Sequence, residues 1–325
     1  MNYTKIIEKF RKCRILVIGD VMLDKYIYGT VSRISPEAPV PIIHASRESF
    51  APGGAANVAK NISSFGGTVY LLGIVGADSS STVLDAILKK EKIRTVFVRD
   101  KSRPTIVKLR MLGHNQQLLR VDYENSELIH KDIEKEAIRK ITLLIKKVDA
   151  VVVSDYAKGI LTENLMRSII SISGKNNKPV VVDPKPVHKE IFRHTTVITP
   201  NNKEASEMSG IPEKDDKSVF EIGKKLVEEL DSNIIITRGE KGMMLFEKNS
   251  SVITNIPTQA REVYDVTGAG DTVVAILTLS LCSGANLKEA ASLANYAAGI
   301  VVGKIGTATT TAEELRSRLK EQNKS

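Results

Sequence analysis

The sequence predicts an α/β fold: a doubly wound, mostly parallel sheet that is flanked by helices. Short runs of β-branched and aliphatic residues alternate with longer amphipathic stretches along most of the 325 residues. Near-continuous apolar runs of this kind are typical of parallel strands that are buried on both faces, and the stretches between them supply the helical crossovers. The length, with 42% hydrophobic residues, also suffices for a sizeable core. We therefore expect one domain that spans residues 1–325.

The expected elements follow one another in strand–helix order. We assign strands to residues 14–19, 68–73, 150–154, 179–183, 196–199 and 233–237. We assign helices to residues 55–64, 81–90, 131–147, 163–172, 218–230 and 271–282, and again from Leu287 onward. Because successive parallel strands join through right-handed crossovers, this order favours a sheet with helices on both faces.

Two segments interrupt the alternation. Residues 26–46 contain strand-like pieces with three prolines and no helix, and residues 105–122 predict a hairpin that turns at residues 113–115. These insertions, at about 25–47 and 103–122, could be edge decorations. Alternatively, they form a small β lid over the carboxyl ends of the parallel strands, where open α/β sheets bind ligands.

Composition and charge limit the partners of the chain. The net charge of +9 could attract nucleic acid, but aromatic residues make up only 5% and tryptophan is missing, so a base-stacking surface is difficult to build. We expect anionic small molecules instead, and no nucleic acid.

The longest apolar stretch, about ten residues, is shorter than the span of about 20 that a transmembrane helix needs. With no apolar leader and two distant cysteines, Cys13 and Cys282, the chain is expected to be cytoplasmic, with no membrane partner.

One glycine-rich stretch, DVTGAGDTVVA (265–275), precedes an apolar run that predicts a buried helix. Helices usually begin with Ser, Thr, Asp or Asn, so Gly268, Ala269 and Gly270 are a poor choice for stability. Bare amides at the positive end of a helix bind an anion, and Asp271 beside them could accept a proton from an attacking hydroxyl group. This combination suits phosphoryl transfer. The structural alternative is a tight turn with an aspartate that complements the helix dipole.

Other nucleotide, metal and hydrolase motifs are missing from the sequence. It contains no GxxxxGK(S/T), no GxGxxG after the first strand and no GxSxG. Its five histidines have no metal-ligand spacing. A P-loop enzyme, a dinucleotide-binding domain and a serine hydrolase are therefore not expected.

A second glycine-rich stretch, APGGAANVAKNISSFGG (51–67), places Gly53 and Gly54 before a helix that contains Asn57. The backbone can approach a ligand closely there, and an asparagine amide can bind hydroxyl groups. GGAANVA, followed much later by DVTGAGDTVVA, resembles the paired motifs of the PfkB carbohydrate kinases, which have the ribokinase-like fold. The resemblance implies an ATP-dependent sugar kinase in which Asp271 is the catalytic base and the amides of residues 268–270 surround the transferred phosphate.

The same resemblance implies sites for Mg²⁺ and for the ATP phosphates. Asn201 and Glu204 match the family's NxxE motif, whose glutamate organises Mg²⁺ through water, although the two residues could also form a helix capping box. Lys185 could contact the phosphates of ATP. In some relatives K⁺ binds near positions that correspond to Asp265 and Thr267.

The turn TRGEKG (237–242) and Asn295 are the expected contacts to the rest of the nucleotide. Thr237, Gly239 and Gly242 match the family's TxGxxG turn that meets ATP, or they form a simple β-turn. Asn295 lies on the helix that flanks adenine in relatives, but it could equally be a packing residue.

Further stretches narrow the substrate class. GDVMLDKYIYGTVSRISPEAPVPII (19–43), KLRMLGHNQQLLRVD (108–122), SDYAKG (154–159) and VDPK (182–185) resemble the kinase half of the bacterial heptose enzymes of lipopolysaccharide synthesis. Those enzymes phosphorylate D-glycero-β-D-manno-heptose 7-phosphate at O1 to give the 1,7-bisphosphate. Another PfkB sugar-phosphate kinase, of the phosphofructokinase or tagatose-phosphate type, is the alternative. The nucleotidyltransferase motif HxGH is missing, so we expect a monofunctional kinase.

The resemblance also implies where the sugar phosphate binds. Asp24 and Asn57 would bind sugar hydroxyls, with Gly53 and Gly54 close by, and Asp20 would either join them or hold the turn. The substrate phosphate needs cations, for which arginine is well suited. The candidates are Arg110, Lys108, Arg33, Arg120 and Lys158. A homodimer in which lid strands pair across subunits is implied as well.

Overall fold

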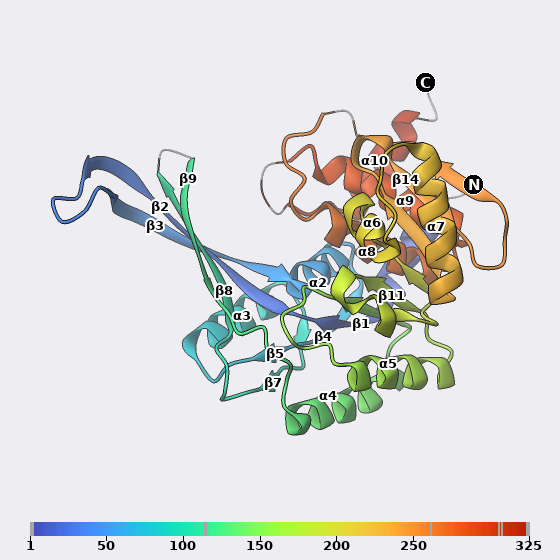
Figure 1. The fold of residues 1–325 in the computed structure, drawn as a ribbon, viewed down its shortest axis with the longest axis horizontal. Helices are drawn as coiled ribbons and strands as arrows, with labels where there is room; N and C mark the ends of the chain where they lie inside the picture. The colour runs from blue at the N-terminus through green and yellow to red at the C-terminus, as the bar shows by residue number, and fades with distance from the viewer. Residues whose placement is uncertain (1–2, 114–115, 261, 305, 307, 323–325) are drawn as a thin grey trace.

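The computed structural model describes residues 3–113, 116–260, 262–304, 306 and 308–322, and a nine-stranded sheet forms its centre (Figure 1). In spatial order the strands are β15 (Ile253–Ile256), β14 (Met243–Phe246), β13 (Asn233–Thr237), β12 (Val197–Ile198), β11 (Val180–Asp183), β10 (Ala150–Ser154), β1 (Arg14–Gly19), β4 (Thr68–Leu72) and β6 (Arg94–Thr95). The pairing is parallel from β13 to β6, and β14 and β15 are antiparallel. The predicted fold class, a mostly parallel sheet flanked by helices, is confirmed.

Alternate residues of each central strand face two separate hydrophobic clusters. In β1, Ile15 and Val17 point into one cluster, whereas Leu16 and Ile18 point into the other. The first cluster is covered by α1 (Tyr3–Lys9), α2 (Ala55–Ser64), α3 (Ser79–Lys90), α8 (Ala269–Cys282), α9 (Leu287–Val301) and α10 (Ala312–Gln322). The second is covered by α4 (Lys131–Leu144), α5 (Glu163–Lys175), α6 (Asn202–Ser209) and α7 (Asp216–Leu230). Burial on both faces explains why these strands have near-continuous apolar sequences.

Several predicted boundaries differ from the observed ones for local reasons. The helix expected to begin at residue 81 begins at Ser79, because the side chain of Asp78 caps it by accepting the N–H of Ser81. The helix expected over residues 131–147 ends at Leu144 and continues as a 3₁₀ turn, Ile145–Lys147. Strands β14 and β15 were not predicted.

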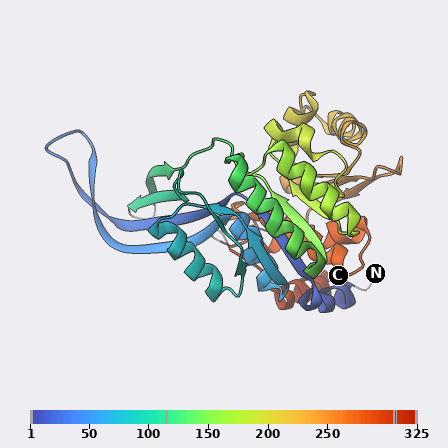
Figure 2. The same ribbon diagram turned by 90° about the horizontal axis from the view of Figure 1, so that it is seen from below.

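A four-stranded sheet, which we call the small sheet, extends from the main body as a long arm (Figures 1 and 2). Its order is β3 (Pro41–Gly54), β2 (Val21–Ile34), β8 (Ile106–Gly113) and β9 (Gln116–Tyr123). A β insertion was therefore correctly predicted in both places, although β2 and β3 are longer than expected. Two of the three predicted turn residues, His114 and Asn115, lie outside the described residues.

The small sheet is joined directly to the main body at two points. β2 begins one residue after β1 ends, and β3 runs without a break into α2. Asp20 and Gly54 are the residues at these junctions, and the N–H of Ala55 donates to the carbonyl of Asp20 at 3.0 Å. The inner end of the small sheet therefore lies at the carboxyl end of β1.

Helix α8 lies in the middle of the first layer, and residues 271–280 of it are buried. Gly268 caps this helix with a φ of 80°, a left-handed conformation that glycine adopts without strain. The helix begins at Ala269, two residues before the predicted start.

No helix in the part of the chain described here is both long and apolar enough to cross a lipid bilayer.

Candidate active site

The carboxyl group of Asp271 lies in the first turn of α8 and is held by two neutral donors. The Nδ2 group of Asn57 on α2 donates to Oδ2 at 2.6 Å. The hydroxyl of Tyr156, in the loop after β10, donates to Oδ1 at 2.9 Å. Only 6% of Asp271 is exposed. Three segments that are distant in the sequence therefore converge on one carboxylate.

Burial raises the pKa of Asp271 from 3.8 to about 6, because the charged form loses its hydration. The hydrogen bonds from Asn57 and Tyr156 lower this pKa, the nearby charge of Asp24 raises it, and that of Lys185 lowers it. The result is a group that is ionised near neutral pH and yet basic enough to accept a proton, as a general base must be.

The residues before Asp271 leave the backbone open to a ligand. Gly270 is exposed, and a Cβ placed on it would meet no atom within 4 Å. The N–H of Ala269 donates to the carbonyl of Val266 at 3.2 Å, so it is engaged. The N–H groups of Gly268, Gly270 and Asp271 have no hydrogen-bond partner among the residues that are described. Free amides at a helix N-terminus are what an anion site needs. The free donors are those of Gly268, Gly270 and Asp271, whereas we expected those of residues 268–270.

The predicted sugar-binding residues surround the other side of Asp271. A Cβ on Gly53 would lie 2.4 Å from Oδ2 of Asp24, so any side chain at this position would displace the carboxylate of Asp24. Asn57 is 2% exposed, and its Oδ1 is buried without a hydrogen-bond partner in the described structure. A buried amide oxygen of this kind has an unused acceptor that a sugar hydroxyl could satisfy.

Asp20 has a different environment from Asp24 and Asn57. Its carboxylate accepts the backbone N–H groups of Tyr156, Lys158 and Ile160 at 3.0, 3.1 and 3.4 Å. Burial raises the pKa of Asp20 to about 6, and these hydrogen bonds lower it. All the observed contacts of the side chain are to the loop after β10, which is the turn-holding role that we considered as the alternative to sugar binding.

The cations considered for the substrate phosphate all lie near carboxylates, except Arg33. Arg110 on β8 donates to Oδ1 of Asp24 at 2.5 Å and lies over the ring of Tyr26. Lys158 pairs with Glu124 at 2.7 Å. The remaining pairs join Lys108 to Asp122 and Glu124, and Arg120 to Asp122. Arg33 lies in β2, far along the small sheet from Asp24.

A cavity of about 480 Å³ lies on the other side of the α8 N-terminus. Its lining includes the predicted nucleotide contacts at the end of β13 and in the turn that follows, together with residues in or next to α8 and α9: Thr237, Gly239, Gly242, Val266, Ala269, Gly270, Asn295 and Val302. Asn295 also donates to the carbonyl of Pro257 at 2.6 Å, so it packs and faces the cavity at once. The mostly apolar lining suits a planar base, and the open amides of α8 lie at its edge.

A smaller cavity of about 180 Å³ adjoins the first, and both are lined by Thr237 and Gly270. It contains Asp271, Asp183 and the predicted phosphate and metal contacts Lys185, Asn201 and Glu204. Lys185 pairs with Glu204. The expected capping box is present as well, since Oδ1 of Asn201 accepts the N–H of Glu204, and Oε2 of Glu204 accepts the N–H of Asn201.

Oxygen atoms suitable as Mg²⁺ ligands therefore face this smaller cavity. In the described part of the chain, no group of three or more His, Cys, Asp or Glu side chains is arranged to hold a metal ion. Mg²⁺ usually keeps several waters and binds through one or two carboxylates and substrate phosphates. Glu204 fits that role as a single protein ligand acting through water.

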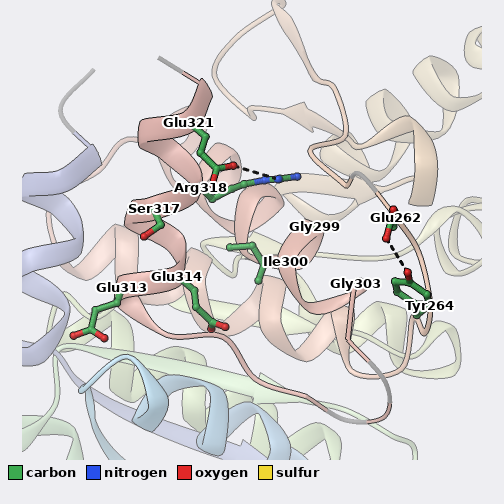
Figure 3. A pocket seen from close by; sticks show the side chains of 10 residues that line it. All are labelled: Glu262, Tyr264, Gly299, Ile300, Gly303, Glu313, Glu314, Ser317, Arg318 and Glu321. Carbon is green, nitrogen blue, oxygen red and sulfur yellow. Dashed lines mark hydrogen bonds and ion pairs between the residues drawn. The ribbon is translucent and has the colours of Figure 1, made fainter. Parts of the chain in front are cut away.

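A further cavity, of about 660 Å³, is a different site (Figure 3). It lies between α9, α10 and residues 262–264, and Gly299 lines both this cavity and the 480 Å³ one. Glu262, Glu313, Glu314 and Glu321 contribute carboxylates, and Arg318 is the one cation among the lining residues. The excess of negative charge would repel a polyphosphate. The 480 Å³ cavity beside α8 has a more apolar lining and suits a nucleotide better.

Two residues of the site were not among those we predicted. Tyr156 follows β10 and Asp183 ends β11, within the motifs SDYAKG and VDPK. Burial raises the pKa of Asp183 well above its ordinary value, and the charges of Asp271 and Glu204 raise it further. Their position at the carboxyl ends of adjacent parallel strands was a usable signal, because ligands bind there in open α/β sheets.

The fold and the carboxylate beside open helix amides together define a kinase that phosphorylates a hydroxyl group. Residues 12–314 match the model of the pfkB family of carbohydrate kinases, and the chain belongs to this family. It is an ATP-dependent sugar kinase.

Several curated relatives are bifunctional proteins. The chain is 43% identical over 313 residues to the bifunctional protein HldE of Actinobacillus succinogenes, covering 96% of this chain and 64% of the relative. It is 44% identical over 313 residues to HldE of Coxiella burnetii, covering 96% and 65%. The chain thus spans less than two thirds of the length of these relatives.

Solved structures of distant kinases have the same fold. The chain resembles Arabidopsis thaliana ribokinase complexed with ribose and ATP, with a TM-score of 0.74 and 20% identity over 95% of this chain and 99% of the other. It also resembles Escherichia coli phosphofructokinase-2 in complex with potassium, with a TM-score of 0.77 and 18% identity over 96% and 99%. At this level of identity the likeness shows the fold.

The raised pKa of Asp271 predicts the pH dependence of the reaction. Only the carboxylate can accept a proton, so kcat should fall as the pH is lowered through about 6 rather than through the ordinary 3.8. The measurement is kcat at saturating substrates between about pH 5 and about pH 8. Asp20 also has a pKa near 6, so an Asp20→Asn variant separates the two carboxyl groups. It should still lose activity at low pH, with a midpoint that shifts only as far as the loop of Tyr156 is disturbed. A limb near the ordinary carboxyl value, or one that disappears in Asp20→Asn, would contradict the assignment.

Proposed function

We propose that the protein transfers the γ-phosphoryl group of ATP to O1 of D-glycero-β-D-manno-heptose 7-phosphate, giving the 1,7-bisphosphate, for the synthesis of lipopolysaccharide precursors. The observation on which kinase chemistry depends is the buried carboxylate of Asp271 beside the open amides of α8. The choice of heptose is supported by residues 19–43 and 108–122, which resemble the bacterial heptose kinases, and by the identity to bifunctional HldE proteins.

In this proposal the sugar and ATP approach Asp271 from opposite sides. The sugar ring lies beside Asp24 and the free Oδ1 of Asn57, with O1 directed at Asp271. Asp271 takes the proton of O1 while the oxygen attacks the γ-phosphorus and ADP leaves. The amides of Gly268, Gly270 and Asp271 bind the negative charge of the transferred group. Mg²⁺, held through water by Glu204, would neutralise phosphate charge.

The substrate phosphate requires at least one cation near Asp24, and Arg110 is the best placed. It reaches Asp24 from the neighbouring strand, and its guanidinium lies 5.4 Å from the ring centre of Tyr26. A guanidinium can bind a carboxylate and a phosphate at once through its several N–H groups. Lys158 and Lys108 would take part only by exchanging their present carboxylate partners.

We further propose that the chain is one kinase domain whose small sheet acts as a lid and as the contact of a cytoplasmic homodimer. Strand register places Asp24, Lys108 and Asp122 on one face of this sheet. The opposite face exposes Phe50 by 39%, Leu119 by 51% and Tyr123 by 54%. An exposed apolar sheet face is typical of a protein interface.

A panel of sugar phosphates assayed for ADP release tests the substrate. Heptose 7-phosphate should give the highest kcat/KM, above fructose 6-phosphate, tagatose 6-phosphate and unphosphorylated sugars. The matched control is Asp271→Asn, which should lose transfer by a factor of at least about 100 while still binding ATP. Activity that survives in Asp271→Asn would show that Asp271 is not the base, and a preference for another sugar would reject the heptose assignment.

Replacing Arg110 tests the phosphate site. Arg110→Gln should raise KM for the sugar phosphate by about 10-fold to 100-fold, because one charge-assisted contact to the phosphate is lost. KM for ATP should stay unchanged. Arg167→Gln, which alters an exposed arginine on α5, is the control. An unchanged KM for the sugar phosphate in Arg110→Gln would assign its phosphate to other residues.

The dimer contact can be tested by placing a charge on the exposed face of the small sheet. Leu119→Glu should convert the dimer to a monomer in sedimentation velocity experiments, because a carboxylate buried in an apolar interface is costly. Leu143→Glu on α4, where the leucine is 61% exposed, should remain dimeric. A wild-type monomer, or a dimer that persists in Leu119→Glu, would reject this contact.

A further inference from the structure

We propose that Tyr156 is a positioning residue for the catalytic step: its hydroxyl fixes Oδ1 of Asp271 so that Oδ2 faces the reacting hydroxyl group. This inference rests on the proposed role of Asp271 as the base. It assigns a function to a side chain that neither the glycine-rich motifs nor the nucleotide contacts include.

The two oxygens of Asp271 lie in different surroundings. Oδ2 is on the side of the open amides, since a Cβ placed on Gly268 would lie 4.0 Å from it. Oδ1 points toward the loop after β10, where the Tyr156 hydroxyl donates to it at 2.9 Å. The transferred phosphate binds at the amides, so Oδ2 is the oxygen that can take the proton. Asn57 donates to Oδ2 at 2.6 Å, and the Tyr156 hydroxyl is the second contact that restricts rotation about the Cβ–Cγ bond. With Asn57 alone, the carboxylate is held at one oxygen only.

The main chain holds Tyr156 in place independently of Asp271. Its own N–H donates to Oδ2 of Asp20 at 3.0 Å. The next residue, Ala157, has a φ of 53° and donates its N–H to Asp155 at 2.8 Å. Asp155 also accepts the N–H of Lys185 at 3.1 Å. Two buried carboxylates thus fix the loop, and the loop fixes the direction of the phenol.

The charges around Tyr156 keep it a hydrogen-bond donor. Asp271, Asp183 and Asp24 face it from α8, β11 and β2, and the ammonium of Lys185 lies 5.8 Å from its ring centre. Burial, followed by the charges of these carboxylates, raises the pKa of Tyr156 well above 10. The phenol therefore stays protonated at every pH at which the enzyme would work. It cannot itself accept the substrate proton, which separates its role from that of Asp271.

The first test is a comparison of Tyr156→Phe with Tyr70→Phe. Tyr156→Phe keeps the ring and removes only the donor, so kcat should fall by about 10-fold to 100-fold while KM for ATP changes less than about twofold. The acid limb of kcat should move up by about one pH unit, because a hydrogen bond that favours the carboxylate is lost. Tyr70→Phe removes a hydroxyl from β4 that accepts from Arg94, remote from Asp271, and should change none of these values.

A rescue experiment separates positioning from packing. Replacing Tyr156 by p-aminophenylalanine restores a donor at the same place on the ring, so kcat and the pH of the acid limb should return most of the way to the wild-type values. A loss caused by altered packing would persist in this variant. Thermal unfolding of each variant checks that the fold is retained.

A measurement without substrate keeps this inference distinct from the proposed function. The ¹³C carboxyl resonance of Asp271, identified by its loss in Asp271→Asn, should titrate at higher pH in Tyr156→Phe than in wild type. Kinetics are run with whichever sugar the wild type phosphorylates, so a wrong substrate would not affect the comparison. An unchanged Asp271 titration together with an unchanged kcat in Tyr156→Phe would overturn the inference.

Discussion

The site depends on keeping one carboxylate, that of Asp271, nearly out of water at the mouth of a buried helix. Its desolvation is unfavourable for the charge and raises the pKa. The hydrogen bonds from Asn57 and Tyr156 and the charge of Lys185 compensate only in part, so the pKa stays near 6. The same burial requires that α8 be apolar along most of its length and that Asn57 and Tyr156 approach from other elements. The positions of α2 and of the loop after β10 are therefore linked to the chemistry.

Asp20 connects this arrangement to the rest of the fold. It stands between β1 and β2, its carboxylate binds three amides of the loop that contains Tyr156, and its carbonyl accepts the N–H at the start of α2. A single buried residue thereby orders both of the segments that donate to Asp271. Buried polar groups whose hydrogen bonds are all satisfied fix one arrangement of a core in this way.

The sequence predicted the parts of this structure that have a local cause. The apolar runs located six of the main strands, and the glycine-rich stretch 265–275 located the start of the buried helix to within two residues. It could not predict that Tyr156 reaches Asp271, because that contact depends on how β10 and α8 pack. Nor could it predict that Arg110 is paired with Asp24, since that depends on the register of β8 against β2. Strands β14 and β15 were missed because their antiparallel pairing departs from the strand–helix alternation.

The unbroken course of β2 and β3 has a mechanical consequence. Strand β2 begins directly after Asp20, which binds the loop of Tyr156. Strand β3 runs directly into α2, the helix that contains Asn57 (Figure 1). The two strands are hydrogen-bonded to each other along most of their length, and their inner ends lie beside Asp271. A displacement of the outer part of these strands would therefore act on Asp20 and on the start of α2, at the two junctions beside Asp271.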